Sequence, residues 1–162
     1  MFKKILVGLL IAFVIIQFFH PKKNISTSPS PNAVAKMYNT PEDVKQILAT
    51  SCNDCHSNNT VYPWYSKVQP VAWWLNNHIN DGKNEMNFDD FKNFSPRRQY
   101  NKLEEVEKQI KEGDMPLNSY TWIHKNAILT EVQKQKLTAW AEGIRNDLKQ
   151  KYPMDSLLRK KR

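Results

Sequence analysis

Residues 52–56 read CNDCH, and this short stretch decides how the chain is expected to fold. On an α-helix, Cys52, Cys55 and His56 lie at positions i, i+3 and i+4, so all three side chains are expected on one surface. Two thiols in this arrangement can add across the two vinyl groups of a haem while the adjacent imidazole ligates its iron. The Cys-x-x-Cys-His pattern is typical of c-type haem attachment. It predicts one covalent haem, with His56 as the proximal iron ligand.

Two other chemistries use the same cysteine spacing. A redox dithiol or a structural disulfide needs no adjacent histidine, and it normally accompanies a thioredoxin-like βαβ pattern that this sequence lacks. A zinc site needs about four ligands, whereas His20, His78 and His124 are scattered without metal-ligand spacing. The chain has two cysteines, and thioether bonds to haem would use both, leaving no free thiol in an exported protein.

A helix start precedes the motif. Residues 40–43 combine an N-cap hydroxyl on Thr40, a proline at the first helical position and acidic residues near the positive end of the helix dipole. Val44, Ile47 and Leu48 then form an apolar stripe, and the helix is expected to continue through the motif. With only four glycines and no sustained strand alternation, the expected fold class is all-α.

The second axial ligand is expected in a loop. A helix is predicted from Ser95-Pro96, with Leu103, Val106 and Ile110 on its buried face and its end at Gly113. Met115 follows, and the proline after it keeps it out of a helix and restricts the backbone. Met115 is therefore the predicted distal ligand. His78 and His124 are the alternatives, which would give a bis-imidazole iron of lower potential, and an empty sixth position would favour ligand binding or peroxide chemistry.

The segment between His56 and Met115 is rich in aromatic residues. Core packing of a small domain explains such residues well, because aromatic side chains dominate buried area. A wall of the haem pocket is the functional alternative, and it makes Trp64 and Trp73 candidate cofactor-binding residues. Arg97 and Arg98 are candidates for pairing with the haem propionates, although charged residues in a first helical turn are commonly solvated.

The ends of the chain differ from its middle. Residues 1–23 are interpreted as a signal anchor or signal peptide, because an apolar run is flanked by lysine pairs. The run is short against the usual span of about 20 residues, but no small-x-small cleavage site follows it, which favours an uncleaved anchor. Residues 24–39, rich in Ser and Pro, predict a flexible linker. Residues 40–150 are the expected haem domain, and residues 151–162 are a basic tail.

The net charge of +8 resides at the two ends, because residues 24–150 carry equal numbers of basic and acidic residues. Nucleic-acid binding therefore has no compositional support. Arg159 to Arg162 are interpreted as a solvated terminus, with attraction to anionic lipid or an acidic partner as the alternative. Covalent haem attachment in bacteria takes place outside the cytoplasm, so the domain is expected at the periplasmic face of the inner membrane.

Several stretches together resemble a bacterial haem-binding domain family of small exported proteins, found notably in Bacteroidetes-type bacteria. They are residues 52–60, 62–66, 69–73, 113–116 and 120–129. The resemblance covers roughly residues 40–150 and implies a c-type haem domain with His56 proximal and Met115 distal. The chain is also similar to cytochrome c in general, in which the attachment helix comes first and a terminal helix crosses it.

The predicted terminal helix begins at a capping box formed by Thr130 and Gln133. Its buried stripe is expected to comprise Val132, Leu137, Trp140, Ala141, Ile144 and Leu148. The expected function is one-electron transfer between membrane and periplasmic redox partner proteins. A peroxidase-like haem enzyme and a haem-based sensor or accessory subunit are the alternatives, although no constellation of catalytic base and nucleophile is visible in the sequence.

Overall fold

The computed structural model describes residues 1–158, and the regular secondary structure of this part of the chain is helical, without a strand. The predicted all-α class is therefore confirmed. Arg159 to Arg162, predicted to form the end of the basic tail, lie outside the described residues.

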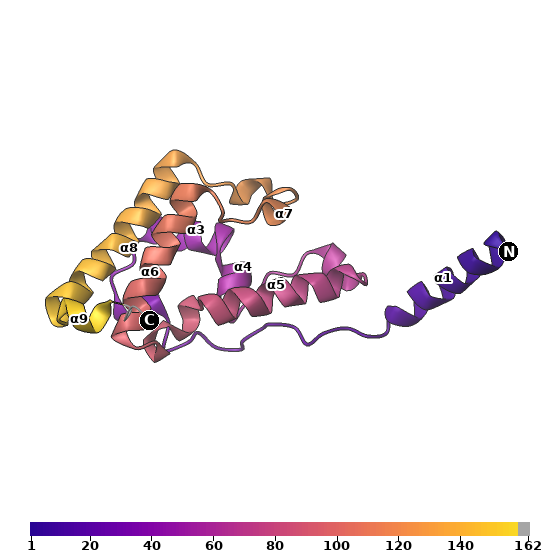
Figure 1. The fold of residues 1–162 in the computed structure, drawn as a ribbon, viewed down its shortest axis with the longest axis horizontal. Helices are drawn as coiled ribbons and strands as arrows, with labels where there is room; N and C mark the ends of the chain where they lie inside the picture. Colours follow the sequence, from indigo (N-terminus) through magenta and orange to yellow (C-terminus); the bar gives the residue numbers. More distant parts are fainter. Residues whose placement is uncertain (159–162) are drawn as a thin grey trace.

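Five longer helices dominate the fold (Figure 1). They are α1 (Phe2–Ile16), α3 (Glu42–Ser51), α5 (Val71–Glu85), α6 (Pro96–Glu112) and α8 (Glu131–Lys151). The short helices are α2 (Val34–Met37), α4 (Asn53–His56), α7 (Asn118–Thr121) and α9 (Met154–Leu157), with 3-10 turns η1 (Trp64–Lys67), η2 (Phe88–Asn93) and η3 (Lys125–Ala127).

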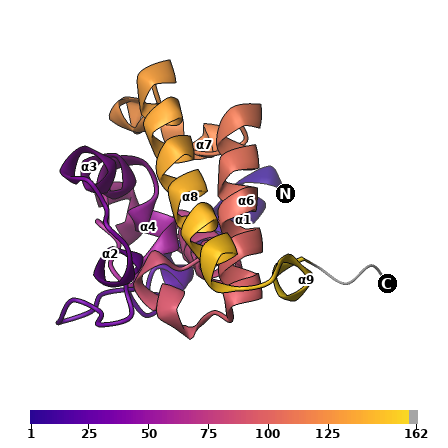
Figure 2. The same cartoon turned by 90° about the vertical axis from the view of Figure 1, so that its left-hand side faces the viewer.

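The apolar core lies where α6 and α8 pack side by side (Figure 2). Helix α3 packs against α8, and the short α9 packs against α6. Phe91, Leu103 and Leu137 are fully buried there, and full burial of side chains of this size stabilises the fold by about 1.5–3 kcal/mol each. This packed pair forms one side of the domain, while α4, α5 and the loop before α7 form the other (Figure 1).

Several helix ends lie where the sequence predicts them. The Ser95 hydroxyl caps α6 by accepting a hydrogen bond from the Arg98 backbone N–H at 3.3 Å, and Gly113 ends that helix with a φ of +78°. The capping box of Thr130 and Gln133 is present at the start of α8. These signals act over three or four residues, so they do not depend on the tertiary fold.

Three details of the predicted helices are wrong. Helix α3 begins at Glu42, one residue later than predicted, and the Thr40 hydroxyl donates to the Tyr38 carbonyl instead of capping the helix. The helix does not continue through the motif, because the backbone breaks at Cys52 with φ −130° and ψ −43°. Val132 is 61% exposed, since it lies in the first turn of α8, before the buried stripe begins.

The packed part of the chain is larger than residues 40–150. Val34 in α2 is buried against the core, although it belongs to the segment predicted as a flexible linker. At the other end, α8 runs to Lys151, and Leu157 in α9 is fully buried. A single apolar side chain in each polar segment anchors that segment, because burial removes its apolar surface from water.

Helix α1 projects away from the rest of the molecule (Figure 1), and it has no buried residue. Within residues 1–158, none of the helices combines the length and apolar character needed to cross a membrane.

Candidate functional site

Two adjoining cavities of about 280 Å³ and about 330 Å³ meet at His56. The first lies between α4, α5 and the loop that leads to α7, and the second lies between α4 and α6. The side chains that line both are Ser51, Cys52, His56, Glu85, Met115 and Pro116. Together the cavities fall within the range of about 300–1,000 Å³ that is usual for ligand sites.

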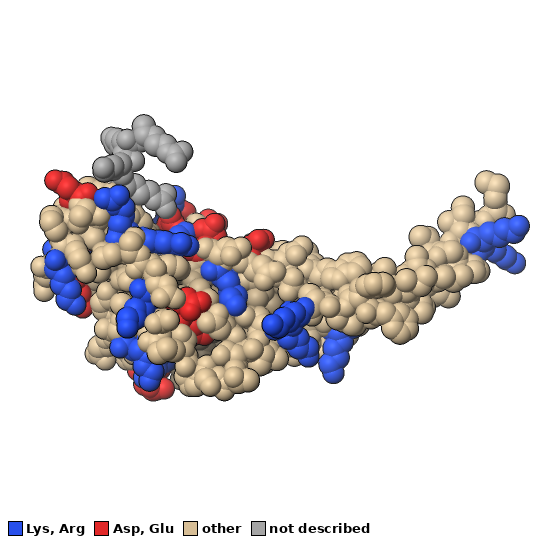
Figure 3. All heavy atoms as spheres, turned by 90° about the horizontal axis from the view of Figure 1, so that it is seen from below, with Lys and Arg blue, Asp and Glu red and all other residues tan. Residues whose placement is uncertain are grey.

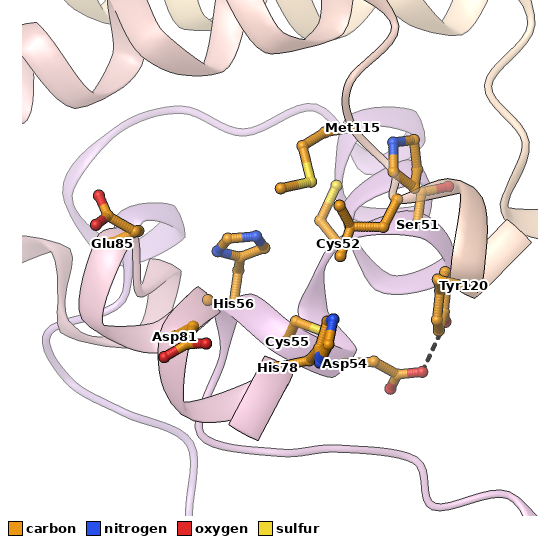
Figure 4. A pocket seen from close by; sticks show the side chains of 13 residues that line it. Ser51, Cys52, Asp54, Cys55, His56, His78, Asp81, Glu85, Met115 and Tyr120 are labelled. Atoms are coloured by element: carbon orange, nitrogen blue, oxygen red, sulfur yellow. Dashed lines mark hydrogen bonds between the residues drawn. The ribbon is translucent and has the colours of Figure 1, made fainter. Parts of the chain in front are cut away.

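The fold brings four of the predicted site residues together. Cys52, Cys55, His56 and Met115 all line the first cavity, and Met115 comes from a loop far away in the sequence. In Figure 4, the imidazole of His56 and the side chain of Met115 point towards the same space, with Cys52 beside them. Two thiols, an imidazole and a thioether thus surround one region.

The break at Cys52 shapes the motif into a short turn. The Cys52 carbonyl accepts hydrogen bonds from the backbone N–H groups of Cys55 at 3.2 Å and His56 at 3.0 Å. This turn is α4, and it presents both thiols and the imidazole to the first cavity even though the helix is not continuous. Cys52, Cys55 and His56 thus face one cavity through a short turn, and not through the continuous helix that the sequence predicts.

The imidazole of His56 is held in one tautomer. Its Nδ1 lies 2.8 Å from the carbonyl oxygen of Met86, and a carbonyl can only accept, so Nδ1 carries the proton and Nε2 keeps a free lone pair. Burial lowers the pKa of His56, which favours the neutral ring. Metal-ligating histidines commonly donate their second ring N–H in this way. His56 is therefore prepared to ligate a metal through Nε2.

The thiols are half-buried and are not joined in a disulfide. Desolvation raises the pKa of Cys52 to about 12 and the pKa of Cys55 to about 11, which favours the protonated thiols. A redox dithiol works through a thiolate of lowered pKa, so the surroundings oppose that alternative. Within residues 1–158, no group of three or more His, Cys, Asp and Glu side chains is arranged to hold a metal ion.

One face of α5 completes the first cavity. His78, Asp81 and Glu85 lie at helical spacing and all line it, as does Gly82. The spacing of these residues was available in the sequence, but polar side chains on a helix are more often solvated.

At the edge of the second cavity, the ammonium group of Lys102 lies 2.7 Å from a carboxylate oxygen of Glu85 and 2.7 Å from one of Glu105.

The motif is also tied to the loop around α7. The Tyr120 hydroxyl donates to the Asp54 carboxylate at 2.7 Å, as Figure 4 shows, and the Val61 backbone N–H donates to the other oxygen of Asp54 at 2.9 Å. Burial and the Asp54 carboxylate raise the pKa of Tyr120, which keeps its phenol protonated. The His124 ring stacks on Tyr120 with centroids 4.3 Å apart. These contacts fix the segment that follows Met115.

The two alternative histidine ligands lie in different places. His78 lines the first cavity, and its Nδ1 donates to the Trp74 carbonyl at 3.0 Å. His124 is engaged elsewhere, because its Nε2 is hydrogen-bonded to the Tyr65 hydroxyl at 2.7 Å. Among the described residues, Met115 is the candidate distal ligand that shares both cavities with His56.

The structure does not bring Trp64 and Trp73 to these cavities. Trp64 is 78% exposed on η1, and the indole of Trp73 donates to the Phe19 carbonyl at 2.8 Å. The second cavity is lined instead by apolar side chains of α6 and its neighbours, among them Phe88, Val106, Ile110 and Leu129.

The two arginines considered as propionate partners also lie elsewhere. Arg97 donates to the Ser156 carbonyl at 2.8 Å. Arg98 donates to the Asn84 carbonyl at 3.1 Å and lies over the Phe94 ring.

Comparison with known proteins gives one match. The family described as a haem-binding domain matches residues 11–143, which include α4, α5 and Met115. No curated protein and no solved structure matches the chain. The donor set fits this cofactor, because an imidazole with a free Nε2 and a thioether line the same cavities, and two thiols lie beside the imidazole.

Proposed function

The chain belongs to the haem-binding domain family, and from this premise we propose that it is a c-type cytochrome that transfers single electrons. Membership of this family identifies haem as the cofactor of the chain. The observation that carries the proposal is the state of His56, whose Nδ1–H is bound to the Met86 carbonyl, so that the lone pair of the neutral ring is on Nε2. The His56 side chain lines a cavity that both thiols and Met115 also line.

Each site residue has a distinct role in this proposal. Cys52 and Cys55 would hold the haem covalently through thioether bonds, while His56 and Met115 would ligate its iron. The bound haem supplies an iron that gains and loses one electron. The chain fixes the orientation of the imidazole through Met86 and lines one side of the second cavity with apolar side chains, which limit the access of water there. A His/Met ligand pair raises the reduction potential relative to two imidazoles.

The proposed location is the periplasmic face of the bacterial inner membrane, with partners among redox proteins of the periplasm or membrane. The apolar residues of α1 are exposed, and lysine pairs flank its apolar run, one pair in the first turn of the helix and one pair after its end. Such a segment directs export and can hold a protein at a membrane. Removal of the segment, giving a soluble periplasmic protein, is the alternative, and the mass of the mature chain distinguishes the two.

The decisive measurement is the absorption spectrum of natively matured protein, oxidised and reduced, together with its mass. We expect one haem added per chain, a low-spin six-coordinate spectrum in both states, and no release of haem into acidified organic solvent. A variant with both Cys52→Ala and Cys55→Ala should release the haem. A high-spin protein that turns over peroxide would reject electron transfer, and a chain without added haem would reject the covalent assignment.

A further inference from the structure

Residues 17–26, here called the strap, connect α1 to the domain and are hydrogen-bonded to it. The backbone N–H of Gln69 donates to the side-chain oxygen of Gln17 at 2.9 Å, and the Gln17 amide donates back to the Gln69 carbonyl at 3.3 Å. The fully buried Gln69 side chain and the Trp73 indole both donate to the Phe19 carbonyl, at 2.6 Å and 2.8 Å. The end of α1 is thus held against the start of α5.

Asn24 fixes the other end of the strap. Its backbone N–H donates to the Tyr62 hydroxyl at 2.7 Å, and its carbonyl accepts from the Thr60 N–H at 3.0 Å. Its side chain donates to the Ser57 carbonyl at 2.9 Å and accepts from the Lys83 ammonium at 2.6 Å. With all of these groups satisfied, the strap has a defined path along the domain.

Two further cavities, of about 340 Å³ and about 600 Å³, lie along the strap and share Lys22 and Lys23. Lys67 lines the smaller one and Lys83 the larger one. These four lysines are here called the basic cradle. Among the described residues that line the two cavities, no acidic side chain occurs. Figure 3 shows basic side chains without acidic ones where the body narrows towards α1.

Among the described residues, no ion pair joins a lysine of the basic cradle to a carboxylate. Lys83 is bound by the neutral amide of Asn24, and Lys23 lies over the Tyr62 ring at 5.4 Å. Some lysines elsewhere do pair with carboxylates, as in Lys45–Glu42, Lys102–Glu105 and Lys134–Glu131. A group of ammonium ions in a hollow without acids favours an anion.

The surroundings identify the kind of anion. The strap begins where the apolar helix α1 ends, and Phe18 is 81% exposed there. Trp73 and Trp74, at the adjacent end of α5, are also exposed. Tryptophan side chains are enriched at the interface between membrane and water, and basic pockets close to an apolar helix bind lipid headgroups. We infer that the basic cradle binds the phosphate headgroup of an anionic membrane lipid.

This inference rests on the proposed membrane location, and it adds an orientation to it. Asn76, Asn80 and Lys83 lie on the face of α5 that lines the cavities of the strap. Asp81 and Glu85 lie on the face of α5 that lines the first cavity, next to His56. A lipid held in the basic cradle therefore fixes the direction in which the haem site faces relative to the bilayer.

The test is native mass spectrometry of the full-length, haem-loaded protein in neutral detergent. It is titrated separately with phosphatidylglycerol, phosphatidylcholine and inorganic phosphate. One variant carries Lys22→Gln, Lys23→Gln, Lys67→Gln and Lys83→Gln. The matched control variant loses four lysines of α6 and α8 through Lys108→Gln, Lys111→Gln, Lys149→Gln and Lys151→Gln. The same spectra report the mass of the haem, so loss of cofactor and loss of lipid are read independently.

We expect the wild type and the control to bind phosphatidylglycerol at least about ten-fold more tightly than phosphatidylcholine, because each lysine near an anionic lipid contributes about five-fold. The cradle variant should lose this preference and keep its haem. Equal binding of both lipids by a haem-loaded wild type would overturn the inference, and so would an unchanged preference in the cradle variant. Inorganic phosphate that binds as tightly as the lipid would also overturn it, as would a mature chain that lacks Lys22 and Lys23.

Discussion

A Cβ atom on Gly82 would lie 2.7 Å from the carbonyl oxygen of Cys55, a separation too short for a real side chain. Helix α5 therefore crosses the short helix α4 in direct backbone contact. This close approach brings the cavity-lining face of α5, with His78, Asp81 and Glu85, up to the thiols. Only glycine, which lacks a Cβ atom, permits this contact. The reason is the space and not the backbone, because Gly82 does not have a positive φ.

Replacement of this glycine should therefore disturb the site. Gly82→Ala forces α5 away from Cys55, and overpacking of this kind costs about 1–3 kcal/mol of the free energy of unfolding. Urea denaturation of the haem-loaded protein measures the loss. Gly143→Ala is the control, because a Cβ there meets no atom within 4 Å, and it should leave the protein equally stable or up to about 1 kcal/mol more stable. Equal effects at the two positions would contradict the close contact.

Met115→Ala should change the iron without releasing the haem. With the proposed ligands, loss of the thioether would leave His56 as the one side chain on the iron, so the oxidised spectrum should move from low-spin to high-spin and the reduction potential should fall. Absorption spectroscopy and redox titration measure the two effects. Met154→Ala, at a partly exposed residue of α9, should reproduce the wild type. A low-spin Met115→Ala protein would point to His78, which also lines the first cavity.

A largely buried ion pair joins α6 to α8. Arg145 donates to both carboxylate oxygens of Glu107, at 3.1 Å and 3.0 Å, and both side chains are largely buried. Arg145→Met leaves the Glu107 charge without its partner, and this should cost about 3–5 kcal/mol of the free energy of unfolding. Lys134→Met, which breaks a more exposed pair with Glu131, should cost less than about 1 kcal/mol. Thermal or urea unfolding compares them.

Gln69→Ala should release the strap and leave the haem site in place. The variant loses the hydrogen bonds of the buried Gln69 side-chain amide, including the one to the Phe19 carbonyl. Its free energy of unfolding should therefore fall by about 1–3 kcal/mol. Hydrogen exchange should become faster at the backbone N–H of Asn24 and Thr60, while the absorption spectrum stays that of the wild type. Gln135→Ala, at an exposed position of α8, is the control. Unchanged exchange at Asn24 would show that Gln69 does not hold the strap.

Local signals explain which parts of the fold the sequence predicts. The Ser95 cap, the Gly113 end and the capping box at Thr130 each involve groups within a few residues, so the sequence contains the whole interaction. The apolar stripe from Leu137 to Leu148 is likewise a property of one helix, and its members are buried as predicted. The all-α class follows from such elements.

Tertiary contacts explain the rest. The bond between His56 and the Met86 carbonyl and the approach of Gly82 to Cys55 depend on how α5 crosses α4, which no short-range pattern encodes. Residues 24–26 of the strap belong to the segment predicted as a flexible linker because it is polar, but the polar groups of Asn24 and Ser26 find partners on the domain. The aromatic side chain of Trp73 makes it a candidate for the wall of the haem pocket, whereas in the structure its indole donates a hydrogen bond to the Phe19 carbonyl of the strap.

The strap also determines where the chain can be shortened for work in solution. A protein that starts at Thr40 would lose α2 with its buried Val34, and it would leave the Gln69 amide without its Phe19 acceptor. Starting at Gln17 instead removes the apolar helix and keeps every contact that the strap makes with the domain. The better starting point for a detergent-free preparation is therefore Gln17, twenty-three residues before the beginning of the domain that composition suggests.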